Sequence, residues 1–307
     1  MMDNNTTTPF VSIIVPVYNA ERTIGRLLQS LGRLAYPRDR YEVLVVDNNS
    51  TDATRALVKT AGDGIRCLEE RTIQSSYAAR NCGIDAARGE LLAFVDADCE
   101  VPPEWLSRAV PAFGDARIGC VACEITGPEP RTPLERYLNA NRVLSPRRTL
   151  AHPYLPFAQT ACVVYRRVVF DRIGRFEPWV SSGDADLDWR MQRQTPYRIR
   201  FEPSVVVLHH HRPTVWTYFK QRFKWAYGSV VLYKKHRTAM PYDWRKSRWE
   251  TKQLLLQGLR LPGAWHRARQ DAAAREAWTQ QRFDVLTGLA TRLGRLYGSL
   301  RHRVWYL

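Results

Sequence analysis

The first 130 residues alternate short apolar runs with segments of helical periodicity, and this alternation restricts the fold more than any other feature of the chain. Residues 10–17, "FVSIIVPV", form a β-branched run that predicts a strand. The apolar residues that follow recur at helical spacing: Ile24, Leu27, Leu28, Leu31 and Leu34. A second strand is predicted at 43–46, followed by the capping-rich turn "DNNSTD" and a further helix.

The alternation continues with "SYAARNCGIDAARGE" (76–90) as a helix and "LLAFVDAD" (91–98) as a strand. "IGCVACEI" (118–125) predicts another strand, and "RFEPSVVVLHHHRP" (200–213) a later one. Strands that alternate with helices at this interval predict an α/β fold, in which a mostly parallel sheet is flanked by helices. In such sheets ligands bind beyond the carboxyl ends of the strands.

Positive charge is concentrated at the C-terminal end of the chain. Residues 209–307 contain 20 Lys and Arg and only 5 Asp and Glu, which is a net charge of +15 out of the +16 carried by the whole chain. We therefore expect a polar, disordered N-terminus at 1–9, an α/β domain at 10–235 and a basic helical region at 236–307.

The last 26 residues predict an amphipathic helix. Its polar side carries Arg292, Arg295, Arg301 and Arg303, and three glycines (Gly288, Gly294 and Gly298) lie on the face opposite the apolar stripe. A basic amphipathic helix can lie in an anionic membrane interface, or it can pack its stripe on the α/β domain. Seven tryptophans in the basic third favour membrane contact. The stripe consists of Leu286, Leu289, Leu293, Leu296, Tyr297, Leu300, Val304 and Leu307.

The sequence shows neither a signal peptide nor an apolar run long enough to span a membrane. The six cysteines do not form the paired framework of a small secreted fold. Cys120 and Cys123 stand three apart in a predicted strand and so point to opposite faces, which predicts core residues. We expect a cytoplasmic protein that is peripheral at the inner face of the membrane.

Three acids follow predicted strands. Asp47 ends the second strand, and Asp96 and Asp98 end the third, so all three are expected at one edge of the sheet. Two carboxylates at i and i+2 can hold one hard divalent cation. An N-cap with a solvated acid beside it is the alternative interpretation of this pair alone.

Four motifs occur in the chain in this order: "VSIIVPVYNAE", "VLVVDNNSTDAT", "SYAARNCGIDAARGELLAFVDADCEVPPEWL" and "SGDADLDWRM". Together they resemble glycosyltransferase family 2, the inverting nucleotide-sugar transferases with the GT-A fold. The resemblance covers roughly residues 10–230. It implies a metal-dependent transferase that moves a sugar from a UDP-, GDP- or dTDP-linked donor to a lipid-linked or saccharide acceptor.

On the donor side, the resemblance implies that Asp47 accepts hydrogen bonds from the base and that Arg80 lies near the base and the diphosphate. The D-x-D motif implies that Asp98 contacts Mn²⁺ or Mg²⁺ and that Asp96 contacts the ribose or a metal-bound water. His209 or His211 would complete the metal site. The other residues implied for the nucleoside pocket are Pro16, Tyr18, Asn19 and Glu21.

On the acceptor side, aligning the segment 183–187 on its D-L dipeptide implies Asp184 as the catalytic base. Gly183 stands where the family often has an acid, and Asp186 or Asp188 is the base if the register slips. The segment "QRFKW" resembles the Q-x-x-R-W element near the acceptor, with Lys224 in place of Arg. The acceptor-side candidates are Asp186, Gln221, Lys224 and Trp225.

Other functional classes explain less of the sequence. A nucleic-acid-binding protein would account for the charge and the aromatic residues, but it leaves the ordered acids without a purpose, and we expect no nucleic-acid partner. A nucleotidyltransferase should show a Gly-rich, basic loop after the first strand, where this chain has "PVYNAERT". A catalytically inactive relative with intact motifs also remains an alternative.

Overall fold

The computed structural model describes residues 8–62, 64–211, 214–269 and 271–307. The chain forms two compact units: the segment up to Pro128 together with Leu144–His210, and Glu129–Val143 together with His211–Leu307. Residues 1–7 of the N-terminus expected to be disordered lie outside the described residues.

The first unit is built around one mixed sheet with the strand order β3-β2-β1-β4-β7-β6-β8-β5. The first four strands in this order are parallel to one another, and β6 is parallel to β8. Strand β7 is antiparallel to both β4 and β6, and β5 is antiparallel to β8. The strands are β1 Val11–Val17, β2 Tyr41–Asp47, β3 Ile65–Glu69, β4 Leu91–Val95, β5 Cys99–Glu100, β6 Ile118–Thr126, β7 Cys162–Arg166 and β8 Arg198–His209.

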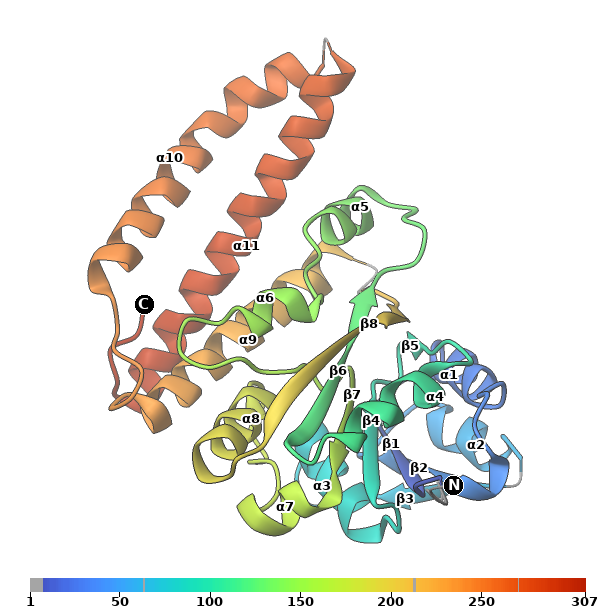
Figure 1. Ribbon diagram of the computed structural model, residues 1–307. Coiled ribbons are helices and arrows are strands. Elements are labelled where there is room, and N and C mark those ends of the chain that lie inside the picture. Colours follow the sequence, from blue (N-terminus) through green and yellow to red (C-terminus); the bar gives the residue numbers. More distant parts are fainter. Residues whose placement is uncertain (1–7, 63, 212–213, 270) are drawn as a thin grey trace. The chain divides into compact units, whose positions relative to one another are not determined.

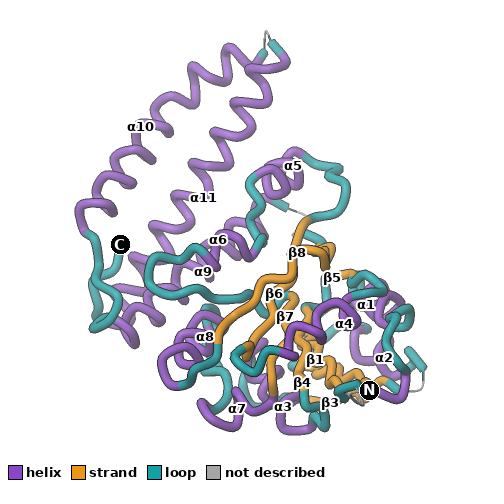
Figure 2. Tube along the Cα trace, in the orientation of Figure 1, coloured by secondary structure: helices purple, strands orange, loops and turns teal. Residues whose placement is uncertain are grey.

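Helices flank this sheet (Figures 1 and 2). In Figure 1, α3, α7 and α8 lie toward one side of the sheet, and α1, α2 and α4 toward the other. The predicted α/β fold with a helical C-terminal region is confirmed. The helices of this unit are α1 Ile24–Leu31, α2 Thr54–Lys59, α3 Ser76–Ala86, α4 Trp105–Ala109, α6 Pro146–Leu150, α7 Arg167–Ile173 and α8 Gly183–Gln194, with 3-10 turns at Arg38–Arg40 and Val110–Gly114.

The central strands are apolar because both of their faces are covered. Every residue of β1, β2 and β4 is buried, as expected for parallel strands packed between helices. Aromatic side chains of β4, β7 and α7 pack together in the core, where Phe94 lies 5.9 Å from Tyr165 and 5.8 Å from Phe170 between ring centroids. Cys120 and Cys123 are fully buried in β6, which confirms that they are core residues.

The register brings the site segments to one edge of the sheet. Strand β1 lies between β2 and β4 and runs parallel to both. The carboxyl ends of β2 and β4 are therefore separated by one strand, or about 10 Å. Asp47 is the last residue of β2, and Asp96 follows directly after β4.

The second unit is helical and consists of α5 (Pro133–Ala140), α9 (Val215–His236), α10 (Trp244–Ala268) and α11 (Ala272–His302). Gly294 lets α11 approach α9 closely, since a Cβ there would lie 2.4 Å from the carbonyl oxygen of Phe223. The face of α11 that carries Gly294 thus packs on α9. The predicted leucine stripe is divided: Val304 is buried and Leu286 packs on a core cluster of this unit, whereas the exposed members are Leu289, Leu293, Leu296, Tyr297 and Leu300.

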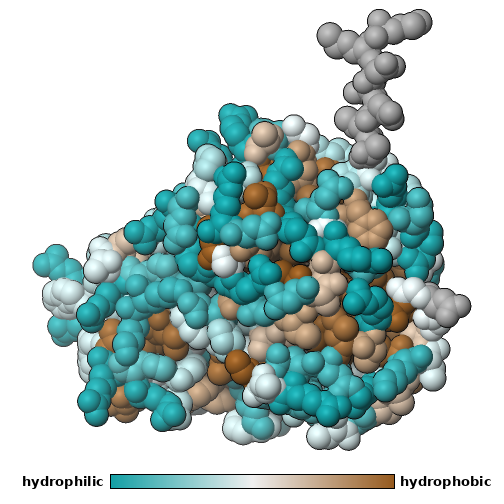
Figure 3. Space-filling model, turned by 90° about the horizontal axis from the view of Figure 1, so that it is seen from below, coloured by the Kyte–Doolittle hydropathy of each residue, from teal (hydrophilic) through white to brown (hydrophobic). Residues whose placement is uncertain are grey.

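No helix in the described residues combines the length and apolar character needed to cross a membrane. The face of the molecule shown in Figure 3 mixes hydrophilic residues with hydrophobic ones that lie between them.

Candidate functional site

Asp47 is a buried carboxylate with an unsatisfied oxygen. Its side chain is 4% exposed, and its Oδ2 accepts a hydrogen bond from the backbone N–H of Ser50 at 3.3 Å. Within the described part of the chain, nothing donates a hydrogen bond to Asp47 Oδ1. Leaving a buried carboxylate oxygen unpaired is costly, so this atom is a ready acceptor for a ligand N–H.

The loop after β1 is fixed to the loop after β2. Asn19, at a positive φ of 49°, accepts a hydrogen bond from the backbone of Thr51 at 2.8 Å, and Glu21 accepts one from the backbone of Ala53 at 3.2 Å. Asn19 and Glu21 therefore shape the edge of the site through its loops. Pro16 is buried in β1, whereas the Tyr18 side chain is exposed beside this edge.

Arg80 on α3 binds the first acid of the D-x-D motif. Its Nη2 lies 2.5 Å from Asp96 Oδ1, and the Arg80 side chain is only 3% exposed. The guanidinium carbon also lies 5.2 Å from the centroid of the Tyr77 ring. A buried arginine paired in this way orients Asp96 directly after β4 and places positive charge at this edge of the sheet.

Asp98, Cys99 and His209 form a candidate metal-binding cluster. One donor atom from each of the three lies within 4.8 Å of the others, and His209 Nε2 is 3.3 Å from Asp98 Oδ1. The antiparallel pairing of β5 and β8 sets Cys99 opposite His209. A carboxylate with an imidazole suits Mn²⁺, and a carboxylate also suits Mg²⁺.

The other two histidines have separate partners. His210 Nε2 lies 2.5 Å from Glu100 Oε1. His211 belongs to the second unit, where its Nε2 lies 2.9 Å from Asn139 Oδ1 on α5. Of the two histidines suggested for the metal, His209 lies beside Asp98, with its Nε2 3.3 Å from Asp98 Oδ1.

The three acids of α8 occupy different environments. Asp186 is 0% exposed and pairs with Arg190 at 2.8 Å, so it presents no surface to an acceptor in this conformation. Asp188 is also 0% exposed and accepts hydrogen bonds from the Ala158 backbone and from the Tyr165 hydroxyl. Asp184 alone of the three is only partly buried.

Asp184 lies in an environment suited to a base. The Tyr77 hydroxyl donates to Asp184 Oδ1 at 3.2 Å, and the Ala185 backbone N–H donates to the same oxygen at 2.9 Å. Burial raises the pKa of Asp184, while these hydrogen bonds and the charge of Arg80 oppose the rise. A raised pKa moves a carboxylate toward the pH range in which general bases work.

The predicted acceptor-side residues Gln221, Lys224 and Trp225 lie on α9, in the second unit. Tyr77, which contacts both Asp184 and Arg80, was not among the predicted site residues. Its position three residues before Arg80 on a predicted helix was the available signal, because side chains at i and i+3 are neighbours.

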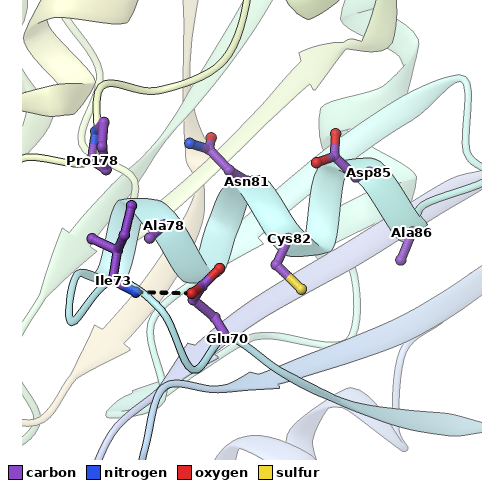
Figure 4. A pocket seen from close by; sticks show the side chains of 8 residues that line it. All are labelled: Glu70, Ile73, Ala78, Asn81, Cys82, Asp85, Ala86 and Pro178. Atoms are coloured by element: carbon purple, nitrogen blue, oxygen red, sulfur yellow. Dashed lines mark hydrogen bonds between the residues drawn. The ribbon is translucent and has the colours of Figure 1, made fainter.

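A depression of about 540 Å³ lies on another side of α3 (Figure 4). It is lined by Glu70, Asn81, Cys82 and Asp85 among others, and by none of the acids described above. Its polar groups already have partners: Ile73 N–H donates to Glu70, Asn81 bonds the Phe176 backbone, and Arg175 binds Asp85. This depression is therefore separate from the candidate site.

The chain is similar to known glycosyltransferases. The family model "Glycosyl transferase family 2" matches residues 12–174. Glycosyltransferase AglE of Haloferax volcanii is 33% identical over 76% of this chain and 77% of its own length. A beta-monoglucosyldiacylglycerol synthase of Nostoc sp. is 35% identical over 37% of this chain and 25% of its own length.

Solved structures share the fold. A mannosyltransferase from Pyrobaculum calidifontis, solved with GDP-Man and Mn²⁺, aligns with a TM-score of 0.68 at 22% identity over 95% of this chain and 88% of that one. S. aureus TarS 1-349 with UDP-GlcNAc aligns with a TM-score of 0.51 at 18% identity, over 97% of this chain and 93% of that one.

Proposed function

The chain belongs to glycosyltransferase family 2, and from this premise we propose that it transfers a sugar from a nucleotide donor, with inversion, to a lipid-linked acceptor. The main support for the proposal is that side chains of α3 contact both a donor-side acid and a partly buried acid. Arg80 of this helix binds Asp96, and Tyr77 of the same helix binds Asp184.

On the donor side, Asp47 Oδ1 would accept the N–H of the base, and the exposed Tyr18 ring would lie along the nucleoside. Asp98 and His209 would hold a divalent cation, with Asp96 beside it. When bound, the cation supplies charge stabilisation for the departing diphosphate. Arg80 orients Asp96 and adds positive charge at the same edge.

On the acceptor side, Asp184 would take the proton of the attacking hydroxyl. Inversion by a single displacement needs one base on the face of the sugar opposite the diphosphate. The other two acids of α8 are buried and held by Arg190, Tyr165 and the Ala158 backbone, which favours Asp184 for this role.

Nucleotide binding tests the donor side. Calorimetric titration with GDP, UDP and dTDP in the presence of Mg²⁺ should show one preferred nucleotide. Asp47→Asn should weaken its binding by about tenfold or more, because hydrogen bonds to a charged acceptor are strong. Asp39→Asn, at an exposed acid of the same unit, is the control and should bind as wild type does. Failure of all three nucleotides to bind wild type, or equal binding by Asp47→Asn, would contradict the nucleoside pocket.

A lipid-linked acceptor requires access to a membrane surface, and the second unit has a suitable face. On α11 the side chains of Leu293 and Leu300 are 48% and 68% exposed, and on α10 that of Leu259 is 79% exposed. Basic residues dominate the charge of both helices. An exposed apolar stripe with basic flanks fits an anionic lipid interface.

Vesicle binding tests this face. Replacing Leu293, Leu296 and Leu300 together by Gln should reduce co-sedimentation with vesicles of phosphatidylcholine and phosphatidylglycerol by at least about tenfold, since each leucine loses its burial in lipid. Leu57→Gln, at an exposed leucine of the first unit, should bind as wild type does. The surface assignment fails if wild type ignores these vesicles at low salt, or if the triple variant binds them equally well.

A further inference from the structure

One side chain, Tyr77, connects the proposed base to the helix that carries the donor-side arginine. Its hydroxyl donates to Asp184 Oδ1 at 3.2 Å, and its ring lies 5.2 Å from the Arg80 guanidinium. We propose that Tyr77 is a positioning residue, which holds the Asp184 carboxylate so that its other oxygen faces the acceptor hydroxyl. This inference rests on the proposed role of Asp184 as the base.

The hydrogen bonds at Asp184 are asymmetric. The Tyr77 hydroxyl and the Ala185 N–H both donate to Oδ1. Two donors on one oxygen fix the rotation of the carboxylate, and the second oxygen, Oδ2, is the one that we assign to the acceptor hydroxyl. A base needs this fixed orientation because proton transfer requires hydrogen-bond geometry to the attacking group.

The Tyr77 ring is held by packing and so can serve as a fixed support. Tyr77 is 6% exposed, and its ring lies 5.6 Å from that of Phe176. A Cβ built at Gly183 would lie 3.0 Å from three carbon atoms of the ring. The absence of a side chain at Gly183 therefore makes room for Tyr77 directly before the base.

The segment that carries Asp184 is tied to α3 at further points. The Ser75 hydroxyl donates to the Trp179 carbonyl at 2.7 Å, and Asn81 both donates to and accepts from the Phe176 backbone, at 2.8 and 3.0 Å. Ser182, immediately before α8, has a positive φ of 67°. A strained residue held by its surroundings is a common feature of functional sites.

The ionisable groups that face Asp184 are Tyr77 and Arg80 from α3 and Asp188 from its own helix. A hydroxyl that donates to the carboxylate favours its charged form. Removal of that hydroxyl should therefore raise the pKa of Asp184, because burial would be opposed by one donor fewer.

The test compares Tyr77→Phe with Tyr165→Phe in the full chain. Tyr165 also donates to a buried carboxylate of α8, at 2.8 Å from Asp188 Oδ1, but it does not contact the base. The pKa of Asp184 can be measured without substrate by NMR titration of the chain labelled with ¹³C at its aspartate carboxyl groups. The Asp184 signal is assigned by its loss in Asp184→Asn. We expect its midpoint to rise by about one pH unit in Tyr77→Phe and to stay in place in Tyr165→Phe.

Kinetics supply the second measurement. With GDP-mannose or UDP-N-acetylglucosamine as donor, kcat should fall about tenfold or more in Tyr77→Phe at an unchanged donor KM, and the acidic limb of the pH profile should move to higher pH. An unmoved Asp184 midpoint, or an equal change in Tyr165→Phe, would overturn the positioning role. The proposed base itself fails separately, if Asp184→Asn keeps wild-type turnover.

Discussion

Asp184→Asn should reduce sugar transfer by about 10²–10⁴-fold, the usual contribution of a general base, while the chain stays folded and binds nucleotide as wild type does. The amide keeps the shape of the side chain and can still accept from Tyr77 and Ala185 through its carbonyl oxygen. It cannot take a proton from the acceptor. Initial rates of nucleoside diphosphate release, compared with nucleotide affinity from calorimetry, separate the lost chemical step from lost binding.

Asp188→Asn is the matched control and should keep its activity. Burial raises the pKa of Asp188 to about 8, so the folded chain keeps this acid neutral at pH values where the unfolded chain has already ionised it. Between the pKa of Asp188 in the unfolded chain and its pKa in the folded chain, the free energy of unfolding of wild type falls by about 1.4 kcal/mol per pH unit as the pH rises. An asparagine cannot ionise and so avoids this loss. The melting temperature of the variant should therefore rise relative to that of wild type from pH 5 to pH 8. A severe loss of turnover in Asp188→Asn with normal turnover in Asp184→Asn would move the base to Asp188.

Asp98→Ala should lower turnover at least about 100-fold, because loss of a direct metal ligand exceeds the roughly 10–100-fold cost of altering an outer partner. The variant should also lose the increase in nucleotide affinity that we expect Mg²⁺ or Mn²⁺ to give to wild type. Affinity measured with metal and again with chelator provides this comparison.

Glu100→Ala is the control for this variant. Glu100 follows Cys99 in β5 and binds His210, and neither Glu100 nor His210 belongs to the proposed metal ligands. It should retain metal-dependent binding. Equal metal dependence in wild type and Asp98→Ala would exclude Asp98 as a ligand.

The sequence predicted the elements whose signal is local. Strands β1, β2 and β4 are mostly apolar because both of their faces are covered, and each is followed by acids or loops of the candidate site. Strand β3, "IRCLE", was missed because it mixes charged and apolar residues and is only partly buried. Strand β5 has two residues and exists only through its pairing with β8, which is distant in sequence.

The division into units depends on contacts that no local pattern reveals. The change in charge near residue 209 lies beside the unit boundary at His210, whereas the domain boundary predicted between residues 235 and 236 lies at the end of α9. Residues 129–143 join the helical unit because Tyr137 of α5 donates to Asp284 of α11, 147 positions later.

The same limit applies to the site. Asp47, Asp96 and Asp98 could be assigned to one edge because parallel strands end together. The contact between Tyr77 and Asp184 spans 107 positions, and the space beside Gly183 is visible only once the Tyr77 ring is placed. The sequence left Asp184, Asp186 and Asp188 as alternatives because only folding distinguishes their burial.

The most direct test of the account is the anomeric configuration of the product. Proton NMR of a complete reaction with Mg²⁺, an α-linked donor such as GDP-mannose or UDP-N-acetylglucosamine, and a bacterial lipid extract follows both the donor and the new linkage. We predict that the donor signal declines as a β-linked product appears, and that neither change occurs with chelator or with Asp184→Asn. An α-linked product would contradict a single displacement with Asp184 as its base.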